Sequence, residues 1–204
     1  MAKLDTLPLF YAPDRPAWRG WLHANHQTAA GVWLVRYRQD VGVPCPGYDE
    51  IVEEALCFGW VDSHIRKLDD ERSKLLVSPR NPKSGWSRLN QQRVERLVAA
   101  GLMAEAGLEA VRRAQASGVW SALDAAEDLV VPPDLAVAFA AAPAALATFE
   151  GFTRGSRKII LTWVYGAKRP ETRAARVAQT VALAAQGLRA NHPQDLQQLR
   201  STSG

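Results

Sequence analysis

The sequence predicts an α+β protein: an N-terminal mixed α/β unit with a small antiparallel sheet, followed by a C-terminal helical unit. Strong strand formers alternate in residues 32–38 and 60–68, whereas apolar residues recur at the helical period through most other segments. After Trp120 an acidic stretch with prolines gives way to alanine-rich helical segments. We therefore predict an α+β domain over residues 1–120, an acidic and proline-containing linker over 121–133, and a helical domain over 134–204.

The elements of the first part follow from local signals. Residues 1–13 are predicted to form an extended lead-in, and Asp14 to cap a helix with Pro16 in its first turn, ending near Asn25. Residues 32–38 are predicted as a strand, and residues 48–58 as a helix that Gly59 ends. Residues 60–68 and 74–78 are expected to pair as a hairpin around a polar turn. Two further helices are predicted at 87–101 and 105–117.

The second part is predicted to be entirely helical. Three candidate helices cover residues 134–141, 144–153 and 156–166. A fourth begins at Pro170, a residue that the first helical turn tolerates, and continues to Gly187. Its apolar residues repeat at the spacing of one helix face, which predicts packing against the other helices. The tail from His192 is polar and is predicted to be frayed.

Composition excludes several classes of protein. The 204 residues are 47% hydrophobic and 23% charged, as in ordinary globular proteins. The longest apolar stretches are shorter than the ~20 residues of a bilayer span, and the N-terminus lacks a signal-peptide pattern, so we expect a soluble, cytoplasmic protein. Cys45 and Cys57 cannot form a disulfide framework, and the four histidines are too scattered for a zinc site. No metal, cofactor or nucleotide-binding loop is predicted.

Residues 60–90 are the strongest candidate for a binding site, because aromatic, acidic, basic and imidazole side chains are most concentrated there. Strand alternation would place Asp62, His64 and Arg66 on one side of the predicted hairpin. Trp86 stands beside a glycine in a loop and is expected to line a cleft. The predicted binding residues are Trp60, Asp62, His64, Arg66, Arg72, Arg80, Lys83, Trp86 and Arg88.

This cluster has three interpretations. Its arginines could bind a phosphate or carboxylate through paired hydrogen bonds. Alternatively, Asp62 could orient His64 as a general base, which would make the protein an enzyme. The third interpretation is a surface ion-pair network on an exposed hairpin, which contributes little to stability.

A second candidate is the basic run in the last third of the chain. It resembles a helix-turn-helix, in which cations of the second helix would contact phosphates or bases. A nucleic-acid-binding function would require one continuous basic surface formed by Arg154, Arg157, Lys168, Arg169, Arg173 and Arg176. The alternative is a solvated helix face.

Three long blocks of sequence resemble the YdeI/OmpD-associated family of bacterial proteins. They are EEALCFGWVDSHIRKLDDER, PRNPKSGWSRLNQQRVERL and GSRKIILTWVYGAKRPETRAARV, and together with residues 17–37 they extend over nearly the whole chain. The resemblance implies a mixed α/β unit followed by a helical unit. It also implies association with an outer-membrane porin and protection against bacteriocins or cationic peptides, and it supplies no catalytic residues.

The residues and the resemblance together predict a non-catalytic binding or stress-protection protein with an anion-binding cleft around residues 60–90. The expected partner is a small anionic ligand or another protein. The alternatives are nucleic-acid binding through the basic C-terminal helices, and an enzyme that uses His64 with Asp62.

Overall fold

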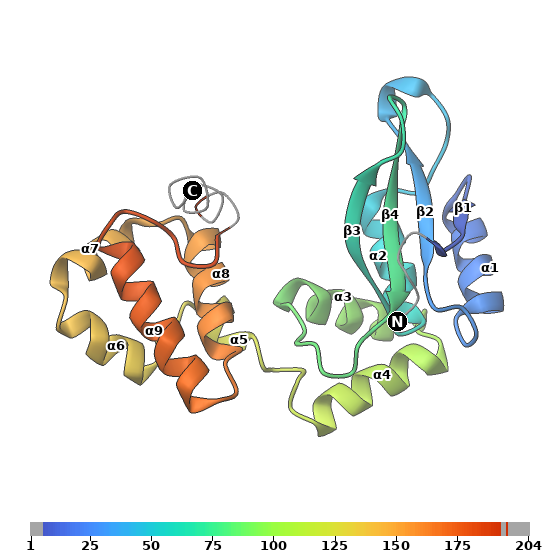
Figure 1. Cartoon of the computed structure of the whole chain (residues 1–204). Coiled ribbons are helices and arrows are strands. Elements are labelled where there is room, and N and C mark those ends of the chain that lie inside the picture. Colours follow the sequence, from blue (N-terminus) through green and yellow to red (C-terminus); the bar gives the residue numbers. More distant parts are fainter. Residues whose placement is uncertain (1–5, 193–194, 196–204) are drawn as a thin grey trace. The chain divides into compact units, whose positions relative to one another are not determined.

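The computed structural model describes residues 6–192 and 195 of the chain (Figure 1). Within this part of the chain it has nine α-helices, a short 3-10 helix (η2, Gln39–Val41) and a four-stranded sheet, which confirms the α+β class. Contacts between Cα atoms divide the chain into two compact units, Met1–Ser121 and Ala122–Gly204. None of the described helices is long and apolar enough to span a membrane.

The sheet of the first unit is mixed, with strand order β1-β2-β4-β3. The predicted hairpin is present as antiparallel β3 (Trp60–Lys67) and β4 (Arg72–Pro79), and β4 also pairs antiparallel with β2 (Val32–Tyr37). Two of the three strand pairs are antiparallel, as predicted, whereas β1 (Leu9–Tyr11) pairs parallel with β2. This short strand was predicted as part of an extended lead-in, since three residues are too few to show an alternating pattern. A helical crossover joins β1 to β2, as parallel pairing requires.

The first two helices of the first unit begin where the sequence provides caps. In α1 (Arg15–Asn25), the Asp14 carboxylate accepts a hydrogen bond from the Ala17 N–H at 2.8 Å. Glu50 reaches back from α2 (Tyr48–Cys57) to accept the Gly47 N–H at 2.8 Å. Helix α2 lies against one face of the sheet, and its apolar side forms the core with α1 and the strands (Figure 1).

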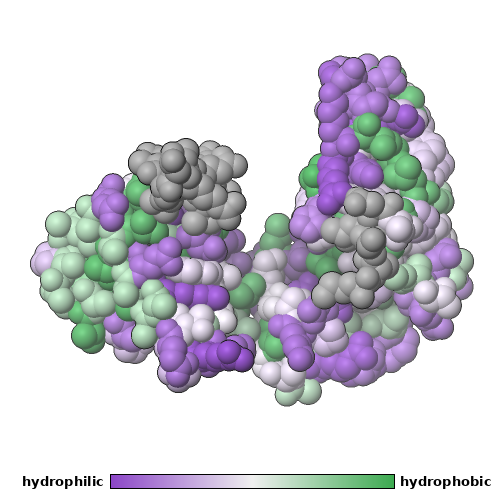
Figure 2. Space-filling model, viewed as in Figure 1, coloured by the Kyte–Doolittle hydropathy of each residue, from purple (hydrophilic) through white to green (hydrophobic). Residues whose placement is uncertain are grey.

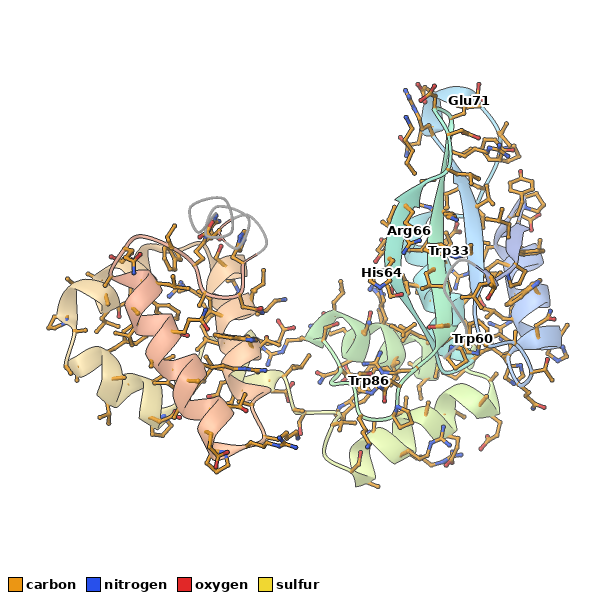
Figure 3. All side chains as sticks on the ribbon, viewed as in Figure 1. Trp33, Trp60, His64, Arg66, Glu71 and Trp86 are labelled. Atoms are coloured by element: carbon orange, nitrogen blue, oxygen red, sulfur yellow. The ribbon has the colours of Figure 1, made fainter. Side chains whose placement is uncertain are left out.

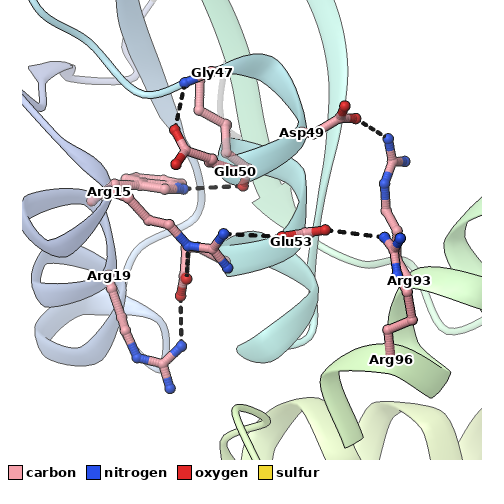
Figure 4. Close-up of polar contacts among 11 residues, drawn as sticks. Arg15, Arg19, Gly47, Asp49, Glu50, Glu53, Arg93 and Arg96 are labelled. Carbon is pink, nitrogen blue, oxygen red and sulfur yellow. Dashed lines mark hydrogen bonds and ion pairs between the residues drawn. The ribbon is translucent and has the colours of Figure 1, made fainter. Parts of the chain in front are cut away.

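Buried charges connect these helices (Figure 4). The Glu54 side chain is 3% exposed, and its two oxygens accept hydrogen bonds from Arg15 Nε and Arg19 Nη1, each at 2.6 Å. Glu53 pairs with Arg15 at 3.0 Å and with Arg96 at 3.1 Å. Because the Glu54 carboxylate is satisfied on both oxygens, its burial is compatible with a stable fold.

The first unit is completed by α3 (Arg88–Ala99) and α4 (Glu105–Ala116). Helix α4 approaches the corner between α2 and β3 so closely that a Cβ added at Gly107 would lie 2.2 Å from the Cys57 carbonyl oxygen. That oxygen accepts the Ala104 N–H at 3.1 Å. Gly59 turns this corner with φ of +73°, and its carbonyl accepts the Arg80 N–H at 3.0 Å. The glycine corner therefore aligns α4 with the end of β4.

The second unit is a bundle of α5 (Asp124–Glu127), α6 (Pro133–Ala140), α7 (Pro143–Gly151), α8 (Arg154–Tyr165) and α9 (Pro170–Ala184). Helix α9 contacts α6, α7 and α8 around a separate apolar core. Residues 121–133, predicted as a linker, contain α5, whose Ala126 is 1% exposed within that core. Four residues give too short a helical pattern to distinguish α5 from a connection by sequence.

The approach of α4 to Cys57 can be tested with a pair of glycine substitutions. Gly107→Ala should reduce the free energy of unfolding by about 1–3 kcal/mol, because the added methyl group would overlap a backbone oxygen. Gly20→Ala in α1 is the control, since a Cβ added at Gly20 would meet no atom within 4 Å. It should stabilise the helix by about 0.5–1 kcal/mol. Urea denaturation measures both, and an equal effect of the two substitutions would contradict the close approach.

Candidate functional site

A groove in the first unit runs along α4, between this helix and the corner at Gly59. Its wider part has a volume of about 470 Å³ and continues into a narrow end of about 30 Å³ beside Arg80. In the opposite direction it continues past Phe58 toward His23 and Ala104. Gly59, Arg80, Ala110 and Arg113 line both the wider part and the narrow end. The volume of the wider part lies within the range of small-molecule binding sites in proteins.

Arg80 is the most unusual residue of the groove. Its guanidinium carbon lies 3.8 Å from the centre of the Trp86 ring, and Nη2 donates to the Gly85 carbonyl. Its Nε is buried and has no hydrogen-bond partner, and no described carboxylate forms an ion pair with it. Burial lowers the pKa of the Arg80 guanidinium to about 10, against a smaller opposing effect of Asp62. Arg80 is therefore charged at neutral pH. It forms no ion pair with the residues that the structure describes, although the Asp62 charge favours its protonated form.

The residues around Arg80 hold it in place. Trp86 is 1% exposed, packs on Trp120 with ring centres 5.0 Å apart, and donates its backbone N–H to the Val119 carbonyl at 3.3 Å. Across the groove, Arg113 approaches Glu109 only at 4.0 Å, while Glu109 is held more closely by Arg112 at 2.9 Å. The groove thus contains two arginines whose positive charges are poorly neutralised by the described side chains. Among these side chains, Arg113 has one weak ion pair, and Arg80 has none.

Three of the predicted site residues line this groove: Trp60, Arg80 and Trp86. Trp60 is 1% exposed and donates Nε1–H to the His26 carbonyl at 3.2 Å. Figure 3 shows Trp60 and Trp86 at the end of the sheet near α4, whereas His64 and Arg66 lie further along β3. Lys83 is exposed outside the groove, and Arg88 is the half-buried first residue of α3.

A bulge in β3 overturns the predicted arrangement of Asp62, His64 and Arg66 on one side of the strand. Asp62 pairs with Val77 and Arg66 with Lys74, with a register shift between them. Because Val77 and Lys74 lie three residues apart on β4, Asp62 and Arg66 are on opposite faces of the sheet. The Arg66 guanidinium instead lies 5.2 Å from the Trp33 ring centre.

The arrangement that an enzyme using His64 would require is absent from this site. The Asp62 carboxylate accepts the Tyr48 hydroxyl at 2.6 Å, and no hydrogen bond joins it to His64 among the described residues. His64 is exposed on β3 and lines none of the three parts of the groove. A general base needs an orienting partner and a substrate site within hydrogen-bond distance, and the described residues give His64 neither.

Two ion pairs lie at the tip of the hairpin. Arg72 pairs with Asp69 at 2.5 Å and Lys67 with Asp70 at 2.5 Å, all on exposed side chains. The surface over this tip is mainly hydrophilic (Figure 2). Arg72 therefore has a local structural role.

The basic residues of the second unit are largely engaged within it. Arg173 forms two hydrogen bonds with Asp134, at 2.7 and 2.8 Å, and a third with the Val164 carbonyl. Arg176 donates to the Trp163 carbonyl and Arg154 to the Glu127 carbonyl. Arg157 is half-buried, while Lys168 and Arg169 are exposed between α8 and α9. These bonds cap helix ends and join helices, which argues against their use as one nucleic-acid surface.

Four residues that line the groove were not predicted from the sequence: His26, Phe58, Glu109 and Arg113. A signal was present in α4. Ala106, Ala110 and Ala114 recur every four residues and form a helix face of small side chains, which also carries Arg113. Small side chains at helical spacing permit a close approach to another element. The sequence does not indicate which element approaches this face.

The comparisons with known proteins match the two parts of the chain separately. Residues 128–187 match the family described as "Bacteriocin-protection, YdeI or OmpD-Associated", which confirms the resemblance for this region. Residues 10–110, which include the first two blocks of the resemblance, match a different model, a domain of unknown function (DUF8412). No curated protein and no solved structure gave a match.

Tyr48 provides a test of the contact that removes Asp62 from the groove. Partial burial, and then the hydrogen bond to the Asp62 carboxylate, raise the pKa of Tyr48 to about 12. An unfolded tyrosine has a pKa of about 10, so the stability from this contact is complete below pH ~10 and is lost between pH ~10 and ~12. The excess stability of the wild type over Tyr48→Phe should therefore shrink over this interval.

Denaturant unfolding at several pH values measures this difference. Asp62→Asn is the companion variant: it should bring the Tyr48 transition in an ultraviolet titration back toward lower pH. A constant difference between wild type and Tyr48→Phe from neutral pH to pH ~12 would contradict the contact.

Proposed function

We propose that this chain, whose residues 128–187 match the YdeI/OmpD-associated family, is a non-catalytic binding protein that holds a small anion at Arg80. The observation that carries the proposal is the half-buried Arg80 guanidinium, whose Nε is buried without a hydrogen-bond partner. It forms no ion pair with a described carboxylate and borders an open groove. A buried cation without a counterion is costly, and an anion bound beside it would offset this cost. The Arg113 guanidinium, on the opposite wall, would add a second charge.

The contrast with Glu54 supports this role for Arg80. Glu54 is buried and Arg80 is half-buried. The Glu54 carboxylate is neutralised by two arginines, whereas Arg80 contacts a ring face and a carbonyl. Neither of these groups carries a full negative charge. Arg80 therefore has the electrostatic properties of a ligand-binding residue more than those of an internal ion pair.

The matched family's description, bacteriocin protection, is compatible with a binding protein that acts in stress protection. Our proposal assigns the anion to the first unit.

Binding of acetate and inorganic phosphate, measured by thermal shift at constant ionic strength, tests the proposal. A ligand that binds only the folded protein should stabilise it by about 1.4 kcal/mol at a concentration ten times its Kd. We expect Arg80→Gln to abolish this stabilisation. Its own stability should stay within about 1 kcal/mol of wild type, because loss of the ring contact is offset by removal of an unneutralised charge.

Lys83→Gln is the matched control, since it removes one positive charge from the same loop at an exposed position outside the groove. It should retain the anion-induced shift. If Arg80→Gln and Lys83→Gln respond to anions as the wild type does, Arg80 is not the binding residue.

A further inference from the structure

The groove has two chemically different ends. The Arg80 end carries the guanidinium groups of Arg80 and Arg113. Toward the N-terminus of α4, the lining changes to Phe58, Ala104 and Ala106, flanked by imidazoles. The Phe58 ring lies 5.1 Å from the His26 ring and 6.4 Å from the His23 ring, centre to centre. One continuous surface therefore connects a cationic end to an apolar and aromatic end.

The dimensions of the two ends also differ. The space beside Arg80 is about 30 Å³, enough for a small planar group. The wider part is about 470 Å³, far more than an inorganic anion requires. A ligand that used only the narrow end would leave the apolar lining in contact with water and would gain nothing from it.

We infer that the groove binds an organic carboxylate with an apolar ring body, its carboxylate between Arg80 and Arg113 and its ring over Phe58, Ala106 and Ala110. This inference rests on the proposed anion-binding function and specifies its ligand class. A planar carboxylate suits the narrow end better than a tetrahedral phosphate, and arginine favours it through paired hydrogen bonds. An aromatic body suits the wide end, where it can contact the Phe58 ring and the alanine methyl groups.

The other polar groups of the groove are compatible with this orientation. Glu105 and Glu109 stand along α4, but the Arg112 guanidinium pairs with both. Their charge is therefore partly neutralised from outside the groove. Arg80 has no such partner among the described residues, so the carboxylate of a ligand should lie at the Arg80 end.

Titration calorimetry with four probes tests the inference: 2-naphthoate, acetate, inorganic phosphate and neutral 2-naphthamide. We expect 2-naphthoate to bind about tenfold or more tightly than acetate or phosphate, because its ring buries additional apolar surface. It should also bind about tenfold or more tightly than 2-naphthamide, which lacks the charge. Ala106→Phe should remove the preference for 2-naphthoate over acetate, because the added ring would fill the wider part of the groove.

Ala116→Phe is the matched control, since it adds the same ring at an exposed position on α4 outside the groove. It should bind all four probes as the wild type does. A second measurement does not depend on how Ala106→Phe folds: nuclear Overhauser effects in the wild-type protein should connect naphthoate protons with the methyl groups of Ala106 and Ala110.

The outcomes separate the two proposals. If acetate and phosphate bind through Arg80 as tightly as 2-naphthoate does, the ligand class is wrong and the anion site remains. If 2-naphthamide binds as tightly as 2-naphthoate, or if Arg80→Gln binds 2-naphthoate normally, both proposals are overturned. Overhauser effects to residues outside the groove would overturn the assigned location.

Discussion

The first unit depends on how closely α4 can approach the corner between α2 and β3. Gly107 makes this possible, because a Cβ there would lie 2.2 Å from the Cys57 carbonyl oxygen. At the same corner, Gly59 adopts a backbone conformation that favours glycine. Its carbonyl binds the backbone of Arg80, while the Cys57 carbonyl binds that of Ala104. Two glycines thus bring the start of α4 and the end of β4 to one point, and the groove lies between them.

Charges inside the first unit are distributed unequally. Glu54 is surrounded by Arg15 and Arg19, so this carboxylate joins α1 to α2 with all of its charge compensated. Arg80 has the opposite environment: it is stacked on Trp86 and has an unpaired Nε. The same domain neutralises the buried charge of Glu54 and leaves the half-buried Arg80 without an ion pair among the described residues. This contrast, which a simple count of ionisable residues would miss, is what distinguishes Arg80 as a candidate binding residue.

The two compact units have separate cores and separate family matches. In the second unit, Arg173 and Arg176 donate to carbonyls of α8, and Arg173 also holds Asp134. These arginines donate to carbonyl groups at the end of a helix. This structural role accounts for the basic residues of this region without requiring a nucleic-acid ligand. The groove and its charges belong entirely to the first unit.

The sequence alone determined the fold class, the positions of most helices and the β3–β4 hairpin, because periodicity, caps and glycine stops are local signals. It also singled out Trp60, Arg80 and Trp86, which line the groove. Tertiary structure decided the parallel pairing of β1, the bulge that separates Asp62 from Arg66, and the placement of Arg80 and Arg113 along one groove. These features depend on contacts between segments distant in the chain. Residue spacing encodes the shape of each segment, but steric fit, as at Gly107 and Cys57, selects which segments meet.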